Sequence, residues 1–94
     1  MIESFKHKGL ERFFADSDKR AIPAQSAARI ERLLDRLEAS IKADDMDLPG
    51  NKCHALKGNR AGEYAVTVTV TGNVRITFRF DGQQATAVNL EDYH

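Results

Sequence analysis

A two-residue alternation of apolar and polar side chains between residues 63 and 80 is the feature that most constrains the fold. Apolar residues occupy the even positions from 64 to 70 and, after the turn sequence Thr71-Gly72-Asn73, again from 74 to 80. Successive side chains of a strand point to opposite faces, so both segments have one apolar and one polar face. Gly72 and Asn73 tolerate the positive φ that a tight hairpin turn requires. The pattern predicts an antiparallel hairpin of strands 64–70 and 74–80.

The polar face of this hairpin carries basic side chains at alternate positions. Arg75 and Arg79 lie on it with Thr77 between them. One interpretation is an ordinary solvated sheet surface, and the other is an anion-binding face. After an Asp81-Gly82 turn, alternation over residues 85–90 predicts a third strand.

Two helices are predicted before the hairpin. Residues 8–15 place Leu10, Phe13 and Phe14 on one face, and Pro23 suits the first turn of a second, longer helix. The apolar stripe of that helix consists of Ile30, Leu33, Leu34, Leu37 and Ile41. Residues 1–5 are interpreted as an edge strand and residues 53–57 as a short extended segment. The order β-α-α followed by strands predicts one α+β domain over residues 1–94, with two N-terminal helices packed on an antiparallel sheet.

Composition excludes several classes of protein. The 94 residues carry 14 basic and 14 acidic groups, which argues against nucleic-acid binding by bulk charge. No apolar run approaches the roughly 20 residues of a membrane span, and no segment resembles a signal peptide. The single Cys53 permits no internal disulfide, and the three histidines are widely spaced. We therefore expect a cytoplasmic protein without a structural metal site.

Several motifs together resemble the HigB toxins of the RelE/ParE superfamily, which belong to bacterial type II toxin–antitoxin systems. The resemblance covers essentially the whole length of the chain. It rests on Met1-Ile2-Glu3-Ser4-Phe5-Lys6-His7-Lys8-Gly9-Leu10, Pro23-Ala24-Gln25, His54-Ala55-Leu56-Lys57-Gly58-Asn59-Arg60-Ala61-Gly62-Glu63-Tyr64, Val74-Arg75-Ile76-Thr77-Phe78 and Glu91-Asp92-Tyr93-His94.

The resemblance implies a microbial RNase-like α+β fold and ribosome-dependent cleavage of mRNA in the ribosomal A site. It also implies three partners, namely a HigA-type helix-turn-helix antitoxin, the 70S ribosome and the mRNA, and it implies no metal, other cofactor or membrane. Two alternatives remain open. One is a non-nuclease toxin that binds DNA gyrase, as ParE toxins do, and the other is a degenerate toxin that only occupies its antitoxin.

Metal-free cleavage of RNA uses the 2′-OH as nucleophile, so the site needs a base, an acid and cations for the phosphoryl oxygens. His54 and His94 are candidates for proton transfer because imidazole titrates near neutral pH. Asp92 is a candidate base, or the group that orients a histidine. Lys57 and Arg75 are the candidate phosphate cations, with Arg75 preferred for its bidentate fork.

The remaining candidates contact substrate rather than reacting atoms. Tyr93 would stack on a base of the message, and Arg60 either contacts the substrate or pairs locally within its turn. Of the two strand arginines, Arg79 is the weaker candidate for the site. Four basic residues near the N-terminus are plausible contacts to ribosomal RNA: Lys6, Lys8, Lys19 and Arg20. All these assignments require the last three side chains to lie beside residues 54–57 and the arginine-bearing strand.

Overall fold

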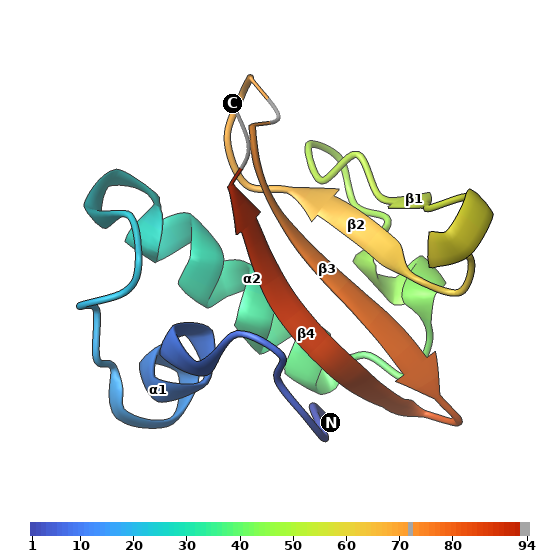
Figure 1. Ribbon diagram of the computed structural model, residues 1–94, viewed down its shortest axis with the longest axis horizontal. Helices are drawn as coiled ribbons and strands as arrows, with labels where there is room; N and C mark the ends of the chain where they lie inside the picture. The colour runs from blue at the N-terminus through green and yellow to red at the C-terminus, as the bar shows by residue number, and fades with distance from the viewer. Residues whose placement is uncertain (72, 93–94) are drawn as a thin grey trace.

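A computed structural model describes residues 1–71 and 73–92 and has two helices beside a four-stranded antiparallel sheet (Figure 1). The helices are α1 (Lys8–Asp16) and α2 (Ala27–Ala39), accompanied by the short 3-10 helices η1 (Ala24–Ser26), η2 (Ala43–Met46) and η3 (Gly58–Arg60). The strands are β1 (His54–Ala55), β2 (Tyr64–Thr67), β3 (Val74–Asp81) and β4 (Gln84–Asp92), and they neighbour each other in chain order. The predicted α+β architecture is confirmed. None of the described helices is long and apolar enough to span a bilayer.

Helix α1 begins and ends with specific caps. His7 Nδ1 accepts a hydrogen bond from the Leu10 backbone N–H at 2.9 Å, which satisfies one of the unpaired donors at a helix start. At the other end Ser17 adopts the left-handed conformation with φ of 58°, and its N–H bonds back to the carbonyls of the last turn. The predicted helix over 8–15 is therefore confirmed to within one residue.

Helix α2 is shorter than its apolar stripe predicted. Pro23 precedes η1 instead of starting the α-helix, and Ser40 after Ala39 is extended with ψ of 149°. The Ile41 N–H donates to Asp45 Oδ2 at 2.9 Å, so the backbone is drawn out of the helix. The prediction that Ile41 extends the stripe was wrong, because its side chain is 51% exposed.

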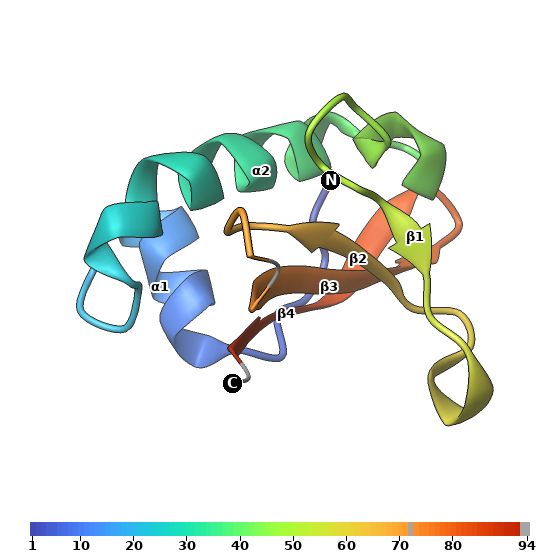
Figure 2. The ribbon, with the colours of Figure 1, turned by 90° about the horizontal axis from the view of Figure 1, so that it is seen from above.

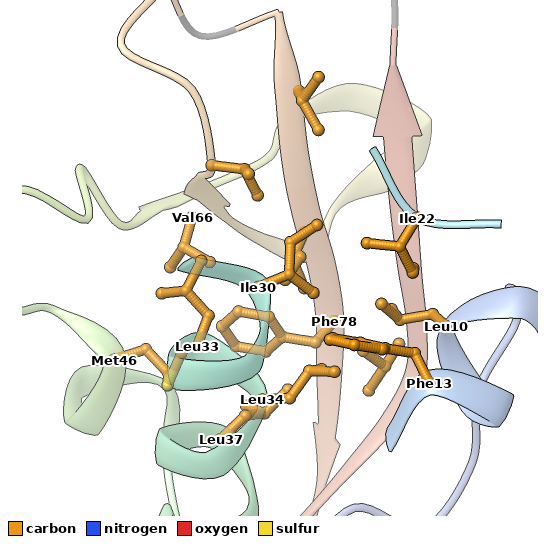
Figure 3. Close-up of a cluster of buried hydrophobic side chains, with 14 of the residues drawn as sticks. Leu10, Phe13, Ile22, Ile30, Leu33, Leu34, Leu37, Met46, Val66 and Phe78 are labelled. Carbon is orange, nitrogen blue, oxygen red and sulfur yellow. The ribbon is translucent and has the colours of Figure 1, made fainter. Parts of the chain in front are cut away.

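The hydrophobic core lies between the helices and the apolar face of the sheet (Figure 3). Figure 2 shows α2 lying along one side of the sheet. Leu10 and Phe13 of α1 are buried together with the α2 stripe, and η2 contributes the fully buried Met46. Phe78 at the centre of β3 has no exposed surface, and its ring stacks against Tyr64 at a centroid distance of 6.0 Å. One face of the sheet is thus occupied by the core.

The hairpin of β2 and β3 is present, but β2 ends earlier than predicted. The Val74 N–H donates to Thr69 Oγ1 at 3.2 Å, so a side chain replaces a backbone partner of the ladder. The N–H groups of Val68 and Thr69 both donate to the Val74 carbonyl. The backbone therefore leaves the regular strand after Thr67, and Val70, predicted on the apolar face, is 98% exposed.

The N-terminal residues lie along the outer edge of β4. Ile2 and Phe5 form isolated parallel bridges with Ala85 and Val88, so the predicted edge strand exists only as two bridges. The register of β3 and β4 shifts by one residue near Phe78, where Ala87 has φ of 51°. This arrangement is a β-bulge, and the Ala87 N–H donates to Ser4 Oγ at 2.9 Å.

Candidate functional site

The candidate site lies on the face of the sheet opposite α2, where strand register aligns the predicted residues in rows. His54 pairs with Ala65, which pairs with Thr77, which in turn pairs with Asn89. Directly opposed residues share a face, so His54 lies on the same face as the arginines of β3. We call this surface the site face; its residues are His54, Ala65, Thr67, Arg75, Thr77, Arg79, Thr86, Asn89 and Glu91.

Five charged side chains on and above the site face form one connected group. Arg60 Nε and Nη2 donate to the two carboxylate oxygens of Glu63 at 3.1 and 2.9 Å. Its Nη1 and Nη2 also donate to Oε1 and Oε2 of Glu91 at 3.2 and 2.5 Å. Arg75 Nε donates to Glu91 Oε1 at 2.9 Å, and Arg79 Nη2 lies 3.8 Å from Glu63 Oε2. We call Arg60, Glu63, Arg75, Arg79 and Glu91 the charge cluster.

The charge cluster holds both of its carboxylates in the ionised form. Burial of Glu91 would raise its pKa, but the hydrogen bonds from Arg60 and Arg75 outweigh that effect and leave the pKa below its usual value. The hydrogen bonds from Arg60 likewise lower the pKa of Glu63. The pKa of Arg60 is raised, first by Glu63 and then by Glu91. Three guanidinium groups facing two carboxylates leave one net positive charge.

The ion pairs of Arg60 span the site face. Arg60 joins Glu63, which precedes β2, to Glu91 on β4, and the line between those two residues crosses β3 at Thr77. Thr77 is 1% exposed and Ala65 is fully buried, although α2 lies on the other side of the sheet. Among the residues that the structure describes, Thr77 Oγ1 is a buried side-chain oxygen without a hydrogen-bond partner. The centre of the site face is therefore buried and not openly solvated.

The loop that carries Arg60 is shaped by glycine and short-range hydrogen bonds. The Leu56 N–H donates to the Glu63 carbonyl at 2.8 Å, which closes the loop around η3. Gly62 has φ of +96°, and a Cβ built there would lie 2.7 Å from Arg79 Nη1. The positive φ favours glycine, and a Cβ would also require the flexible end of the Arg79 side chain to move. In Figure 2, η3 lies on the side of the sheet away from α2.

His54 presents one particular ring nitrogen to the solvent. Its Nδ1 lies 2.9 Å from the Lys52 carbonyl oxygen. A carbonyl only accepts hydrogen bonds, so Nδ1 carries the proton and Nε2 holds the lone pair of the neutral ring. His54 and Lys57 are both exposed, and Lys57 directly precedes η3. The structure thus leaves His54 Nε2 accessible to a ligand that reaches this face.

The other predicted site residues are placed differently. Arg60 and Arg75 are brought together through Glu91. Asp92 lies at the end of β4 and pairs with Val74, which belongs to the core. Strand alternation therefore assigns Asp92 to the opposite face of the sheet from the site face. Tyr93 and His94 lie outside the described residues.

Glu63 and Glu91 are members of the site that the sequence did not indicate. Glu91 belongs to a motif noted in the sequence, but its role depends on the pairing of β4 with β3, which places it directly opposite Arg75. Glu63 likewise appeared only within a motif, directly before the first predicted strand of the hairpin. They could have been found only by aligning the acidic residues with the arginines of the neighbouring strand. That alignment requires the strand register to be known.

Two hollows lined by described residues border the site face. A hollow of about 570 Å³ borders it at Thr67 and is lined by residues of the α2 start, the 50–52 loop and the end of β2, including Arg29, Lys52 and Val70. A second hollow of about 220 Å³ at the β1 edge is lined in part by Asp44, Asp47 and His54. Within residues 1–71 and 73–92, no group of three or more His, Cys, Asp or Glu side chains is arranged to hold a metal ion.

Comparisons with known proteins agree with this architecture. A family model described as the RelE-like toxin of the type II toxin–antitoxin system HigB matches residues 3–94. The chain is also similar to a protein from Proteus vulgaris named Endoribonuclease HigB, with 39% identity over 94 residues that cover 100% of both chains. The chain therefore belongs to the HigB-like family of RelE-like toxins of type II toxin–antitoxin systems.

Proposed function

We propose that this protein is a toxin that acts as a ribosome-dependent mRNA endoribonuclease, cleaving the message in the ribosomal A site and inhibiting translation. The observation that carries the proposal is the shared face of His54 and Arg75, with a proton acceptor and an anion-binding cation on one sheet surface. The Proteus vulgaris relative, named as an endoribonuclease, supports RNA cleavage as the activity. Neither comparison favours the ParE-like alternative of gyrase binding.

The reaction divides into proton transfer and charge stabilisation. The 2′-OH attacks the adjacent phosphorus, the P–O5′ bond breaks, and a 2′,3′-cyclic phosphate and a 5′-OH are formed. His54 Nε2 is suited to remove the 2′-OH proton, because the Lys52 carbonyl holds the proton of the neutral ring on Nδ1. His94 is proposed as the second group that transfers protons. Asp92 pairs with the core residue Val74, on the side of the sheet away from His54, so it is proposed to orient a histidine and not to act as the base.

Cations then stabilise the charge that develops on the phosphoryl oxygens. Arg75 and Lys57 are proposed for this role, and Tyr93 for stacking against a base of the message. His54 and Arg75 lie two strands apart, about 10 Å across the sheet, and are offset by two residues, about 7 Å along it. Side chains that converge from these positions can contact one nucleotide. Arg60 is proposed to contact substrate only with its outward-facing side, because Nε, Nη1 and Nη2 already donate to Glu63 or Glu91.

Family membership implies an antitoxin as partner. We propose the HigA type with a helix-turn-helix for that antitoxin, and the 70S ribosome and mRNA as the other partners. The proposed location is the cytoplasm, where the translated message is found. Lys6, Lys8, Lys19 and Arg20 are all exposed and are proposed contacts to ribosomal RNA.

The test is cleavage of a reporter message, with and without translating 70S ribosomes, followed by mapping of the 5′ ends. The proposal predicts cuts that require ribosomes. Replacement of His54, Asp92 or His94 by alanine should lower the rate roughly 10²–10⁴-fold, the usual worth of one acid–base group. If the message stays intact with and without ribosomes and the protein causes gyrase-dependent DNA breakage, the ParE-like alternative holds instead. Wild-type rates for all three variants would overturn the site assignment.

A further inference from the structure

We propose that Glu91 is a positioning residue that fixes the guanidinium of Arg75 for transition-state binding, and that Arg60 holds Glu91 in place. The inference rests on the proposed function, because it deepens the role of Arg75 in that reaction. It starts from the geometry of one carboxylate shared by two arginines. Glu91 is directly opposite Arg75 in the antiparallel ladder, and its side chain is 19% exposed.

The contact between the two residues fixes a particular edge of the guanidinium. Glu91 Oε1 accepts from Arg75 Nε at 2.9 Å, and the Arg75 side chain is only 18% exposed. A hydrogen bond at Nε sets the rotation of the planar group, and with it the direction of the two Nη nitrogens. Arginine grips phosphate through two parallel N–H groups, so this direction decides whether the fork faces the phosphoryl oxygens.

The carboxylate is itself held on a second side. Arg60 donates from Nη1 and Nη2 to both oxygens of Glu91, and Glu63 anchors the same guanidinium from the other direction. Glu91 therefore has little freedom to rotate away from Arg75. Geometry of this kind matters for rate, since a displacement of about 1 Å at a catalytic group can cost about 10²-fold.

Electrostatics gives Glu91 an opposite effect on binding. Its negative charge lies beside the cation that would receive an anionic substrate, so the charge weakens phosphate binding while the hydrogen bond orients Arg75. Removal of the charge should therefore strengthen ground-state binding and weaken transition-state stabilisation. A fall in the half-saturating concentration together with a fall in the maximal rate is what a merely structural residue would not produce.

Glu63 provides a matched control. Its side chain is also 19% exposed, and it also pairs with Arg60, but its other partner is Arg79 and not Arg75. Glu63→Gln removes the same charge from the same cluster while leaving the Glu91–Arg75 contact in place. Glu63 contacts Arg79 and not Arg75, so its charge should act less strongly on an anion at Arg75. Its replacement can disturb the orientation of Arg75 only through Arg60.

The experiment measures single-turnover mRNA cleavage on programmed 70S ribosomes over a range of ribosome concentrations. We expect Glu91→Gln to lower the maximal rate about 10–100-fold and to lower the half-saturating concentration about twofold to fivefold. Glu63→Gln should shift half-saturation less and lower the maximal rate less than Glu91→Gln does, because it leaves the Glu91–Arg75 contact in place. Equal maximal rates for the two glutamine variants would overturn the inference.

A double-mutant cycle separates this inference from the proposed function. If Glu91 acts through Arg75, Arg75→Ala and Arg75→Ala/Glu91→Gln should cleave at the same reduced maximal rate. Additive losses would show that Glu91 acts independently and would overturn the inference alone. A wild-type rate for Arg75→Ala would instead overturn the role of Arg75 in the proposed function. Glu91→Asp keeps the charge but shortens the side chain, so its maximal rate should also fall if orientation matters. Urea unfolding of each variant verifies that the variant is folded.

Discussion

Arg60→Ala is the perturbation whose effect on stability follows most directly from the structure. The substitution removes four hydrogen bonds to two carboxylates. An exposed ion pair contributes up to about 1 kcal/mol, and breaking a buried one costs about 3–5 kcal/mol. The Arg60 side chain is 34% exposed, so each of its two ion pairs should contribute close to the value for an exposed pair. Arg60→Ala should therefore lower the free energy of unfolding by about 2 kcal/mol. For a domain of this size, that lowers the melting temperature by about 10 °C.

The pH dependence of this loss distinguishes ion pairing from packing. The folded-state pKa values of Glu63 and Glu91 are lowered, so their contribution is complete above the unfolded-state value of 4.5. It is lost as the pH falls through the lower folded-state pKa values. Urea unfolding at pH 7 and at decreasing pH below 4.5 should therefore show a difference between wild type and Arg60→Ala that shrinks with acid.

The exposed Arg32 of α2 supplies the control, since Arg32→Ala should change the free energy of unfolding by no more than about 0.5 kcal/mol. A loss below about 0.5 kcal/mol for Arg60→Ala at pH 7 would refute the reasoning. So would a loss that is the same at pH 7 and in acid, because the carboxylates would then not be the groups that hold the loop.

Three further substitutions test other parts of the fold by urea unfolding at pH 7. Phe78→Ala should destabilise by about 3–5 kcal/mol, because the ring is fully buried between α2 and the sheet; a loss under about 1.5 kcal/mol would contradict its central position. Thr77→Val should stabilise by about 1 kcal/mol, since it removes a buried hydroxyl that has no partner among the described residues; destabilisation would show that the hydroxyl is satisfied. Ala87→Gly should stabilise by about 0.5 kcal/mol, because relief of about 1–2 kcal/mol of left-handed strain exceeds the added chain entropy of about 0.4–1 kcal/mol; an unchanged or lower midpoint would contradict this.

The sequence predicted the parts of the fold that depend on local periodicity. The stripe from Ile30 to Leu37 identified α2, and the alternation from Val74 to Phe80 identified β3, because each pattern matches the geometry of its element. Ile41 and Val70 continued those patterns in the sequence but not in the structure. In both places a side chain, Asp45 or Thr69, binds a backbone N–H and ends the element.

The candidate site was less predictable because its geometry depends on strand register. His54, Arg60 and Arg75 were identified as individual residues, and the sheet places His54 and Arg75 on one face. The pairing of Arg75 with Glu91 joins residues 16 positions apart, and the pairing of Arg60 with Glu91 joins residues 31 positions apart. Local patterns carry no information about such contacts. The roles of Asp92, Tyr93 and His94 stay predictions.

The chemistry of the cleaved ends tests the proposed function most directly. Reporter mRNA cut in the presence of the protein and translating ribosomes can be assayed for ligation of its downstream fragments with and without prior treatment by polynucleotide kinase. Attack by the 2′-OH predicts 5′-OH ends that ligate only after phosphorylation, and upstream fragments that end in a cyclic phosphate. Downstream fragments with 5′-phosphates, ligated without kinase, would contradict the assigned acid–base mechanism.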